Sequence, residues 1–178
     1  MQKGLVFALG ALMSLALVST TTPANALWWL IEGPTRQTVA FKDTRFKPGS
    51  IVIKTDERRL YLVEENGRAT MYKIGVGRPG FSWKGTKRVS RKAEWPGWTP
   101  PPAMRAREPW LPAYMPGGPE NPLGARALYL GSSLYRIHGT NQKETIGQAV
   151  SSGCFRMMND DVIHLYERVR VGARVHVI

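Results

Sequence analysis

The segment that most constrains the fold is RRLYLVEENGRATMYKIGVG, residues 58–77, in which two apolar-alternating runs flank Asn66-Gly67. Alternation of apolar and polar residues is typical of a strand with one buried face, and Asn-Gly is a preferred pair for a two-residue hairpin turn. GSIVIKT precedes it as a short β-branched run, RALYLGSSLYRIHG predicts a second hairpin that leaves His138 at a strand end, and ARVHVI predicts a final strand. We therefore expect a mainly β fold built on an antiparallel sheet.

One helix is predicted just before the final strand. Its apolar residues recur at the spacing of a single helix face: Val162, Leu165, Tyr166 and Val169. Asn159 is expected to cap this helix, and the carboxylates of Asp160 and Asp161 suit the positive end of its dipole. Gly172 follows as a termination signal. The apolar stripe is expected to pack on the sheet.

The segment from residue 95 to residue 122 differs from the rest, because it holds nine of the 13 prolines together with three tryptophans. Proline fixes the backbone and removes a donor, so we expect neither a central strand nor a regular helix there. Long irregular loops inside a compact domain are usually functional, and the aromatic residues argue against disorder. The segment is expected to be an ordered lid beside a site, with a purely structural flap as the alternative.

The first 26 residues have the features of an export signal. Lys3 begins it, an apolar run continues to Val18, and Ala24-Asn25-Ala26 has the form of a cleavage site. The run is shorter than the roughly 20 residues that a membrane-spanning helix needs, so no stable membrane insertion is expected after cleavage. We expect export to the periplasm or cell-wall space and three parts: signal peptide 1–26, N-terminal segment 27–49 and a single folded domain 50–178.

The charge balance favours anionic partners. The formal net charge is +12, and the stretch KGTKRVSRK, residues 84–92, carries five cations and no acid. A field of this sign attracts anions. For an exported protein, the carboxylates and phosphates of a cell wall or membrane surface are the expected partners, and nucleic acid is not. A solvated basic loop is the alternative.

IHGTNQKETIGQAVSSGCFRM, residues 137–157, contains the only cysteine of the chain, Cys154, and one histidine, His138. A lone cysteine in an exported chain cannot form an internal disulfide, so a reactive thiol or an intermolecular disulfide is expected, and a buried apolar thiol is the alternative. An adjacent imidazole can accept the thiol proton in acyl transfer. Gly153 allows a sharp turn that presents amide N–H groups to an oxyanion, and Arg156 is suited to bind a carboxylate. These residues predict acyl transfer or hydrolysis by a thiol.

HGTN followed by IGQAVSSGCFRM closely resembles the signature of the L,D-transpeptidase catalytic domain of the YkuD type. The upstream GGPENPLGARALYL and WPGWTPP are similar to that family's approach to its site. The resemblance covers residues 50–178 and implies a single L,D-transpeptidase-like β-sandwich domain with one or two short helices. Histidine and cysteine show no metal-ligand spacing, and no glycine-rich phosphate loop follows a strand, so no metal or other cofactor is implied.

The resemblance implies a cysteine acyltransferase that acts on peptidoglycan stem peptides. Its thiol attacks a stem tetrapeptide after the diamino acid, releases the terminal D-alanine, and passes the acyl group to an amine of another stem or of an outer-membrane protein. Carried across, Cys154 is the nucleophile, His138 the proton acceptor and donor, and the Gly139 carbonyl orients the imidazole. We expect five further site residues. Gly153, with an oxyanion N–H, and Ser152, which lines the site, are expected at the reacting centre, and Arg156, Tyr129 and Asn141 are expected to bind the substrate.

Two departures from the family pattern keep other functions open. This chain has Ser151-Ser152-Gly153-Cys154 where the family most often has Ser-His-Gly-Cys, and SWKGT where many relatives have Thr-Pro-x-Gly. One alternative is a thiol hydrolase or carboxypeptidase of wall peptides, with water as the acceptor. The other is a catalytically weak wall-binding module that uses the basic stretch and the tryptophan-rich segment.

Overall fold

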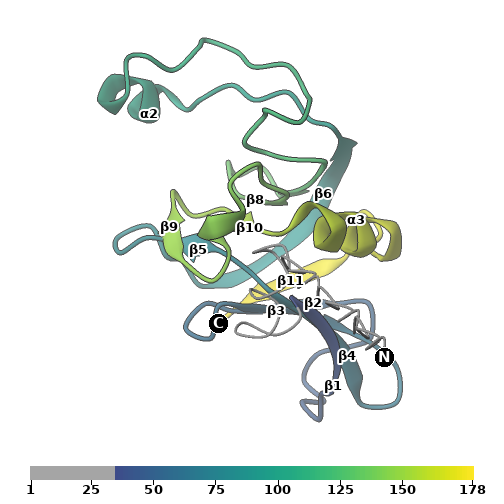
Figure 1. Ribbon diagram of the computed structural model, residues 1–178. Coiled ribbons are helices and arrows are strands. Elements are labelled where there is room, and N and C mark those ends of the chain that lie inside the picture. The colour runs from purple at the N-terminus through teal and green to yellow at the C-terminus, as the bar shows by residue number, and fades with distance from the viewer. Residues whose placement is uncertain (1–34) are drawn as a thin grey trace, which may run out of the picture. The chain divides into compact units, whose positions relative to one another are not determined.

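The computed structural model describes residues 35–178, so the expected signal peptide and residues 27–34 lie outside the described residues (Figure 1). Nine strands form one sheet in the order β1 (Arg36–Ala40), β4 (Arg68–Lys73), β3 (Arg59–Val63), β2 (Ile51–Lys54), β11 (Arg174–Val177), β6 (Gly85–Glu94), β7 (Arg126–Leu130), β8 (Arg136–His138) and β10 (Phe155–Arg156). Two more strands pair with each other, β5 (Val76–Gly77) and β9 (Ala149–Ser151). The helices are α2 (Pro102–Arg107), α3 (Asn159–Arg168) and the short 3-10 helix η1 (Lys143–Thr145). The expected mainly β fold with one or two short α-helices is confirmed.

Both predicted hairpins are present. Strands β3 and β4 pair antiparallel around Asn66 and Gly67, whose φ angles of 59° and 67° are the left-handed values that a two-residue hairpin turn requires. Strands β7 and β8 pair antiparallel as well, and His138 is the last residue of β8. The final strand, β11, lies between β2 and β6, so the end of the chain is in the middle of the sheet.

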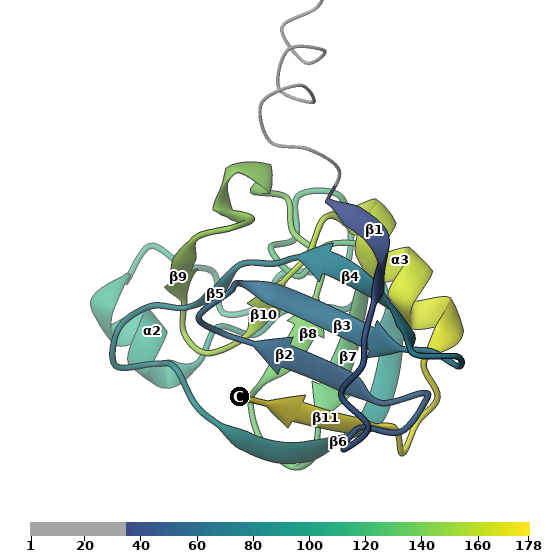
Figure 2. The same ribbon diagram turned by 90° about the horizontal axis from the view of Figure 1, so that it is seen from below.

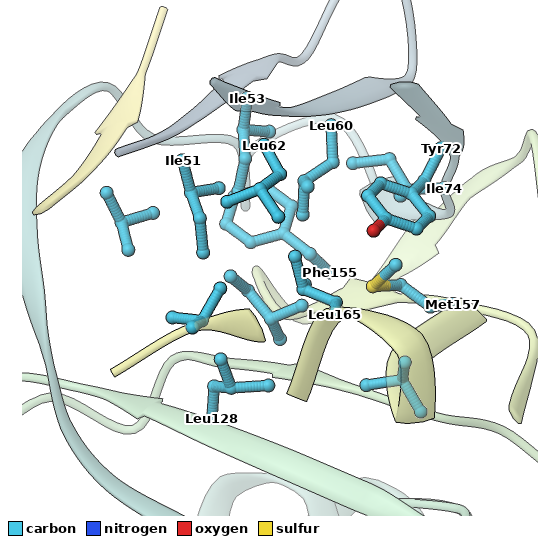
Figure 3. Close-up of a cluster of buried hydrophobic side chains, with 14 of the residues drawn as sticks. Ile51, Ile53, Leu60, Leu62, Tyr72, Ile74, Leu128, Phe155, Met157 and Leu165 are labelled. Carbon is cyan, nitrogen blue, oxygen red and sulfur yellow. The ribbon is translucent and has the colours of Figure 1, made fainter. Parts of the chain in front are cut away.

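Strand β6 joins the two halves of the sheet. Its first residues pair with β11 and its last with β7, with a register shift between Val89 and Arg91. Such irregularities bend and twist a strand. Side chains from the two halves meet in one core, where Ile51 and Leu60 lie across from Leu128 (Figure 3). The expected sandwich is therefore formed by a single curled sheet.

Helix α3 packs on this core through its apolar stripe, in which Leu165 is fully buried. Replacing Leu165 with alanine should therefore lower the stability of the fold by about 2–5 kcal/mol. The expected cap is wrong. The helix begins at Asn159 itself, so Met158 holds the cap position without a side-chain hydrogen bond. The Asn159 side-chain oxygen instead accepts hydrogen bonds from the backbone N–H groups of Ala125 and Thr140, at 3.0 and 3.3 Å. This amide ties the start of the helix to two loops.

The proline-rich segment, residues 95–122, contains helix α2, which corrects the expectation that no regular helix could form there. Pro102 is at the start of α2, where its missing N–H removes no helical hydrogen bond. Trp98 and Met115 exchange two backbone hydrogen bonds of 2.8 Å across the segment. Figure 1 shows α2 and its flanking chain extending away from the sheet. Neither α2 nor any other helix within residues 35–178 is long and apolar enough to span a membrane.

Candidate active site

The parallel pairing of β8 and β10 brings the cysteine and the histidine to one face. The register places Phe155 opposite Ile137 and Arg156 opposite His138. Because side chains alternate between the two faces of a strand, Ile137 and Phe155 enter the core and their neighbours turn to the other side. That side borders a cavity of about 440 Å³, which we call the cleft, and it contributes four residues: Arg136, His138, Cys154 and Arg156.

The His138 ring is buried, and its protonation is set by the backbone beside it. Nδ1 lies 2.6 Å from the carbonyl oxygen of Gly139. A carbonyl can only accept a hydrogen bond, so Nδ1 carries the proton and Nε2 keeps a free lone pair. Burial lowers the pKa of His138 from 6.5 to about 3; the Gly139 contact opposes this shift, and the charges of Arg156 and Arg136 add to it. The imidazole is therefore neutral and can accept a proton.

Cys154 is half-buried, and its Sγ lies 3.7 Å from the backbone oxygen of Leu134. Desolvation raises the pKa of the Cys154 thiol, while the charge and donors of Arg136 and then the charge of Arg156 lower it. At neutral pH the raised thiol pKa and the lowered imidazole pKa together favour a neutral thiol and a neutral imidazole in the same cleft. Proton transfer is then expected to accompany attack on a substrate instead of preceding it.

The turn that carries Cys154 is held from several sides. The Ser151 hydroxyl donates to the Cys154 backbone oxygen at 2.6 Å and accepts from the Gly153 N–H at 3.1 Å. The indole N–H of Trp83 donates to the Gly153 oxygen at 2.9 Å, and its ring stacks on Tyr135 at 4.7 Å. Gly153 has a φ of 102°, a left-handed value that favours glycine. Sequence reasoning missed Trp83 and Ser151, although Trp83 belongs to the SWKGT departure.

The Gly153 amide is already engaged with Ser151, so it does not point freely at an oxyanion. Gly139 is constrained too, because a Cβ at this position would overlap the Asn159 side-chain oxygen. Asn159 thus holds Thr140 and crowds Gly139, directly after the catalytic candidate His138. Gly139 therefore has two roles: its lack of a side chain allows the close approach of Asn159, and its carbonyl oxygen holds the His138 ring.

The cleft combines apolar walls with positive charge. The proline-rich segment contributes Trp98, Met104 and Pro122 among others, and Phe81 and Tyr135 also border the cleft. Among residues 35–178, no acidic residue borders it and three arginines do: Arg107, Arg136 and Arg156. A cleft with this charge balance favours a substrate that carries carboxylates.

The remaining predicted residues occupy different places. Ser152 borders the cleft, and its hydroxyl accepts a hydrogen bond from Arg78 at 3.1 Å. Arg156 also borders it and donates to the Gln142 side chain at 3.1 Å. Tyr129 is not among the residues that border the cleft; its ring lies 3.7 Å from the Arg91 guanidinium carbon. Asn141 is exposed and donates to the Glu120 backbone oxygen at 2.8 Å, which ties it to the end of the proline-rich segment.

Arg136 is a cleft residue that sequence reasoning did not select. Its guanidinium donates to the Leu134 oxygen at 3.0 Å and lies 5.2 Å from the Tyr129 ring centre. Its Nε is buried and has no hydrogen-bond partner within the described residues. The only available signal was its position two residues before His138, which places both side chains on one strand face. Within residues 35–178, no group of three or more His, Cys, Asp or Glu side chains is arranged to hold a metal.

A thiol and a neutral imidazole on one face of a mainly β fold form a site that can support nucleophilic acyl transfer. The family model of the L,D-transpeptidase catalytic domain matches residues 48–177. In Escherichia coli K12, the Probable L,D-transpeptidases ErfK/SrfK and YbiS are 43% and 44% identical to this chain over 137 and 138 residues. The matches take in 72% of this chain, which spans only 43% and 44% of the lengths of those relatives. The chain belongs to the L,D-transpeptidase catalytic-domain family.

Solved structures agree on the fold. An L,D-transpeptidase from Mycobacterium smegmatis matches with a TM-score of 0.57 at 18% identity, over 72% of this chain and 57% of that chain. A Brucella melitensis protein described as a probable carnitine operon oxidoreductase matches with a TM-score of 0.56 at 44% identity, over 84% of this chain and 98% of that chain. At 18% identity the first match shows the fold alone, and the functional description of the second belongs to that protein.

Proposed function

We propose that this protein is an exported L,D-transpeptidase that uses Cys154 to transfer peptidoglycan stem peptides to an amine. The observation that carries the proposal is the β8–β10 register, which puts Cys154 and His138 on one face of one cleft. Family membership and the names of the curated relatives support the reaction class. Within residues 35–178 the cleft is bordered by three arginines and no acid, which supports a donor that carries carboxylates, as a stem peptide does.

The proposed reaction begins with a neutral pair. His138 Nε2 accepts the thiol proton as Sγ bonds to the carbonyl carbon of the donor, and the Gly139 carbonyl holds Nδ1–H so that Nε2 faces the reaction. The imidazolium then gives its proton to the nitrogen of the departing D-alanine, and the carbon–nitrogen bond breaks to leave a thioester. An acceptor amine attacks the thioester, His138 takes the amine proton, and the proton returns to the released sulfur.

Charge that develops during these steps needs stabilisation. Because the Gly153 N–H is bonded to Ser151, we assign the oxyanion to the backbone N–H of Cys154 itself, which donates none of the backbone hydrogen bonds found between loops of residues 35–178. Arg136 is assigned the role of stabilising the charge that develops on the Cys154 sulfur. Its donors lower the thiol pKa and its Nε has no other partner, so it is suited to stabilise the thiolate as the proton leaves.

The proline-rich segment is assigned as the lid of this cleft, because Trp98, Met104 and Pro122 border it and the segment extends away from the sheet (Figure 1). Exclusion of water by such a lid would favour an amine over water as the acceptor. A hydrolase that uses water is the second candidate, supported by the exposure of the segment's own Trp110 and Tyr114, at 76% and 59%.

Product analysis tests the proposal. The purified protein is incubated with tetrapeptide stems that contain a diamino acid, and the products are followed by mass spectrometry. We expect released D-alanine together with cross-linked dimers, and neither from a Cys154→Ala protein. Tripeptide without dimer would assign the protein as a hydrolase or carboxypeptidase. Binding to wall preparations without any cleavage would assign it as a binding module.

A further inference from the structure

A second and larger cavity lies away from the cleft. It has a volume of about 980 Å³ and is formed where β2 and β11 begin, where β3 ends, and where the chain leaves α3. Figure 2 shows these strand ends and α3 on the right, and α2 and β9 of the cleft region on the left. No residue from 35 to 178 borders both cavities. We call this second cavity the basic groove.

The basic groove is lined mainly by cations. Six lysine and arginine side chains from four segments border it: Arg45, Lys47, Arg88, Arg168, Arg170 and Arg174. In the described part of the chain only two acids do so, Glu64 and Glu65, and the Glu64 carboxylate already accepts a hydrogen bond from the Thr70 hydroxyl at 2.5 Å. Of the basic stretch at residues 84–92, only Arg88 reaches the groove. The groove therefore brings together cations that lie far apart in the sequence.

Few of these cations are neutralised by neighbours. Arg45 pairs with Asp43 at 2.6 Å, and Arg168 makes a long contact of 3.6 Å with Glu167, a pair in which both side chains are solvent-exposed. Exposed pairs of this kind contribute little. Four groove cations have no ion-pair partner within residues 35–178: Lys47, Arg88, Arg170 and Arg174. The positive field of the groove is thus mostly uncompensated.

The sheet itself holds two like charges together in the groove. Arg174 on β11 is directly opposite Arg88 on β6 in the antiparallel register. Like charges in opposed positions destabilise a strand pair. The Arg88 guanidinium is partly satisfied by the Gly172 oxygen at 2.8 Å, but that carbonyl carries no formal charge. An anion bound between the two arginines would remove this repulsion.

We infer that the basic groove binds an extended polyanion that carries a phosphate in each repeat. Five of its six cations are arginines, whose planar forks match phosphate oxygens in pairs. The groove is far larger than a single phosphate, so a strand with several phosphates fills it better than a free ion does. The cavity is also concave, which suits a polymer strand more than a flat membrane surface. This site is separate from the thiol chemistry proposed above.

Titration of the purified protein with short-chain inorganic polyphosphate tests the inference. The groove variant is Arg88→Gln/Arg174→Gln, and the matched control is Lys84→Gln/Lys143→Gln, which removes the same charge from exposed positions that border neither cavity. We expect the groove variant to lose about tenfold or more in affinity and the control to stay within about twofold. The slope of log affinity against log salt should fall by about two in the groove variant only.

Other outcomes overturn the inference. Equal losses in both variants would mean that net charge alone attracts the polymer, and equal binding of inorganic phosphate and polyphosphate would exclude an extended ligand. Binding to vesicles of phosphatidylglycerol and phosphatidylcholine that depends on the groove, without binding of polyphosphate, would assign the groove to a membrane surface. Thermal melting is the control for correct folding of the variants. Because the groove variant loses the like-charge pair, it should be at least as stable as the unmodified protein. Alkylation of Cys154 should be unchanged in both variants, so the result does not depend on transpeptidation.

Discussion

The two walls of the cleft are built in opposite ways. On the sheet side, His138 is 4% exposed, its strand lies between β7 and β10, and its ring, backbone and following glycine are each held by a contact. On the other side, α2 buries none of its residues and Trp110 is 76% exposed. The sheet side is fixed by packing and backbone hydrogen bonds, whereas the proline-rich segment is attached at a few points.

This difference suits the two walls to different tasks: the sheet side to proton transfer, and the proline-rich segment to the entry of substrate. Groups that move protons must stay within a fraction of an ångström of their productive positions, and a packed sheet can hold them there. Lids must open, so they are drawn from regions with few buried contacts. Variants on the sheet side should therefore change the chemical step or the titration, and variants in the proline-rich segment should change binding and local opening.

The largest effect is expected from His138→Gln, which removes the proposed proton acceptor on the sheet side. Transfer to the amine should slow by about 10²–10⁴-fold, the usual range for loss of a general base, while the fold is retained. Steady-state rates of D-alanine release measure this, with circular dichroism as the control. Activity close to that of the unmodified protein would remove His138 from the mechanism.

The same residue predicts how stability depends on pH. In the unfolded chain the imidazole takes up a proton below its ordinary pKa of 6.5, whereas burial lowers the folded pKa to about 3. Acid therefore favours unfolding, and the contribution of neutral His138 is lost as the pH falls from 6.5 towards 3. Between pH 7 and pH 4.5 this amounts to roughly 2–3 kcal/mol. Denaturant unfolding should show a steeper acid loss for the unmodified protein than for His138→Gln, and parallel curves would contradict the buried neutral imidazole.

A smaller effect is expected from Arg136→Gln at the sulfur. Loss of the nearby cation should raise the thiol pKa and slow alkylation by iodoacetamide about tenfold at pH 7. Arg91→Gln is the matched control, because Arg91 lies over the same Tyr129 ring at 3.7 Å but does not border the cleft. Alkylation quenched at successive times and followed by mass spectrometry gives the rate for each variant. Equal slowing in the two variants would show a packing effect through Tyr129 instead of a charge at the thiol.

The smallest effect is expected on the other wall. Asn121 is buried, and its side chain donates to the Met115 and Pro116 oxygens and accepts from the Leu123 N–H. Asn121→Ala should loosen the proline-rich segment, raise KM a few-fold and speed hydrogen exchange there, with little change in kcat. Asn141→Ala, which loses only one exposed contact to Glu120, is the milder comparison. A fall in kcat with unchanged KM would place the segment in the chemical step.

Much of the sheet side could be predicted from the sequence, because its signals are local. The Asn66-Gly67 turn, the alternating runs and the helical stripe of α3 depend on neighbouring residues, and all three are confirmed. The contacts that complete the site join distant residues. Asn159 was expected to cap its helix, yet it bonds to Ala125 and Thr140, and no local rule could reveal that.

In the proline-rich segment, the sequence rules were local but were applied too broadly. Proline content excludes a helix interior but not a helix start, so α2 could form behind Pro102. The basic stretch at residues 84–92 was also misleading as a single patch, because strand alternation sends Lys87 toward Trp83 and Tyr135 and Arg88 into the basic groove. Charge along the chain becomes informative only after the strand faces are known.

The central claim is that the Cys154 sulfur becomes covalently acylated within this cleft. Intact-mass measurement after acid quenching, with a tetrapeptide donor and no acceptor amine, tests it most directly. We predict a protein heavier by the tripeptide acyl group, with the added mass on the peptide that contains Cys154, and no adduct on Cys154→Ala. Release of D-alanine at the same rate by Cys154→Ala, or an adduct at any other residue, would contradict the account.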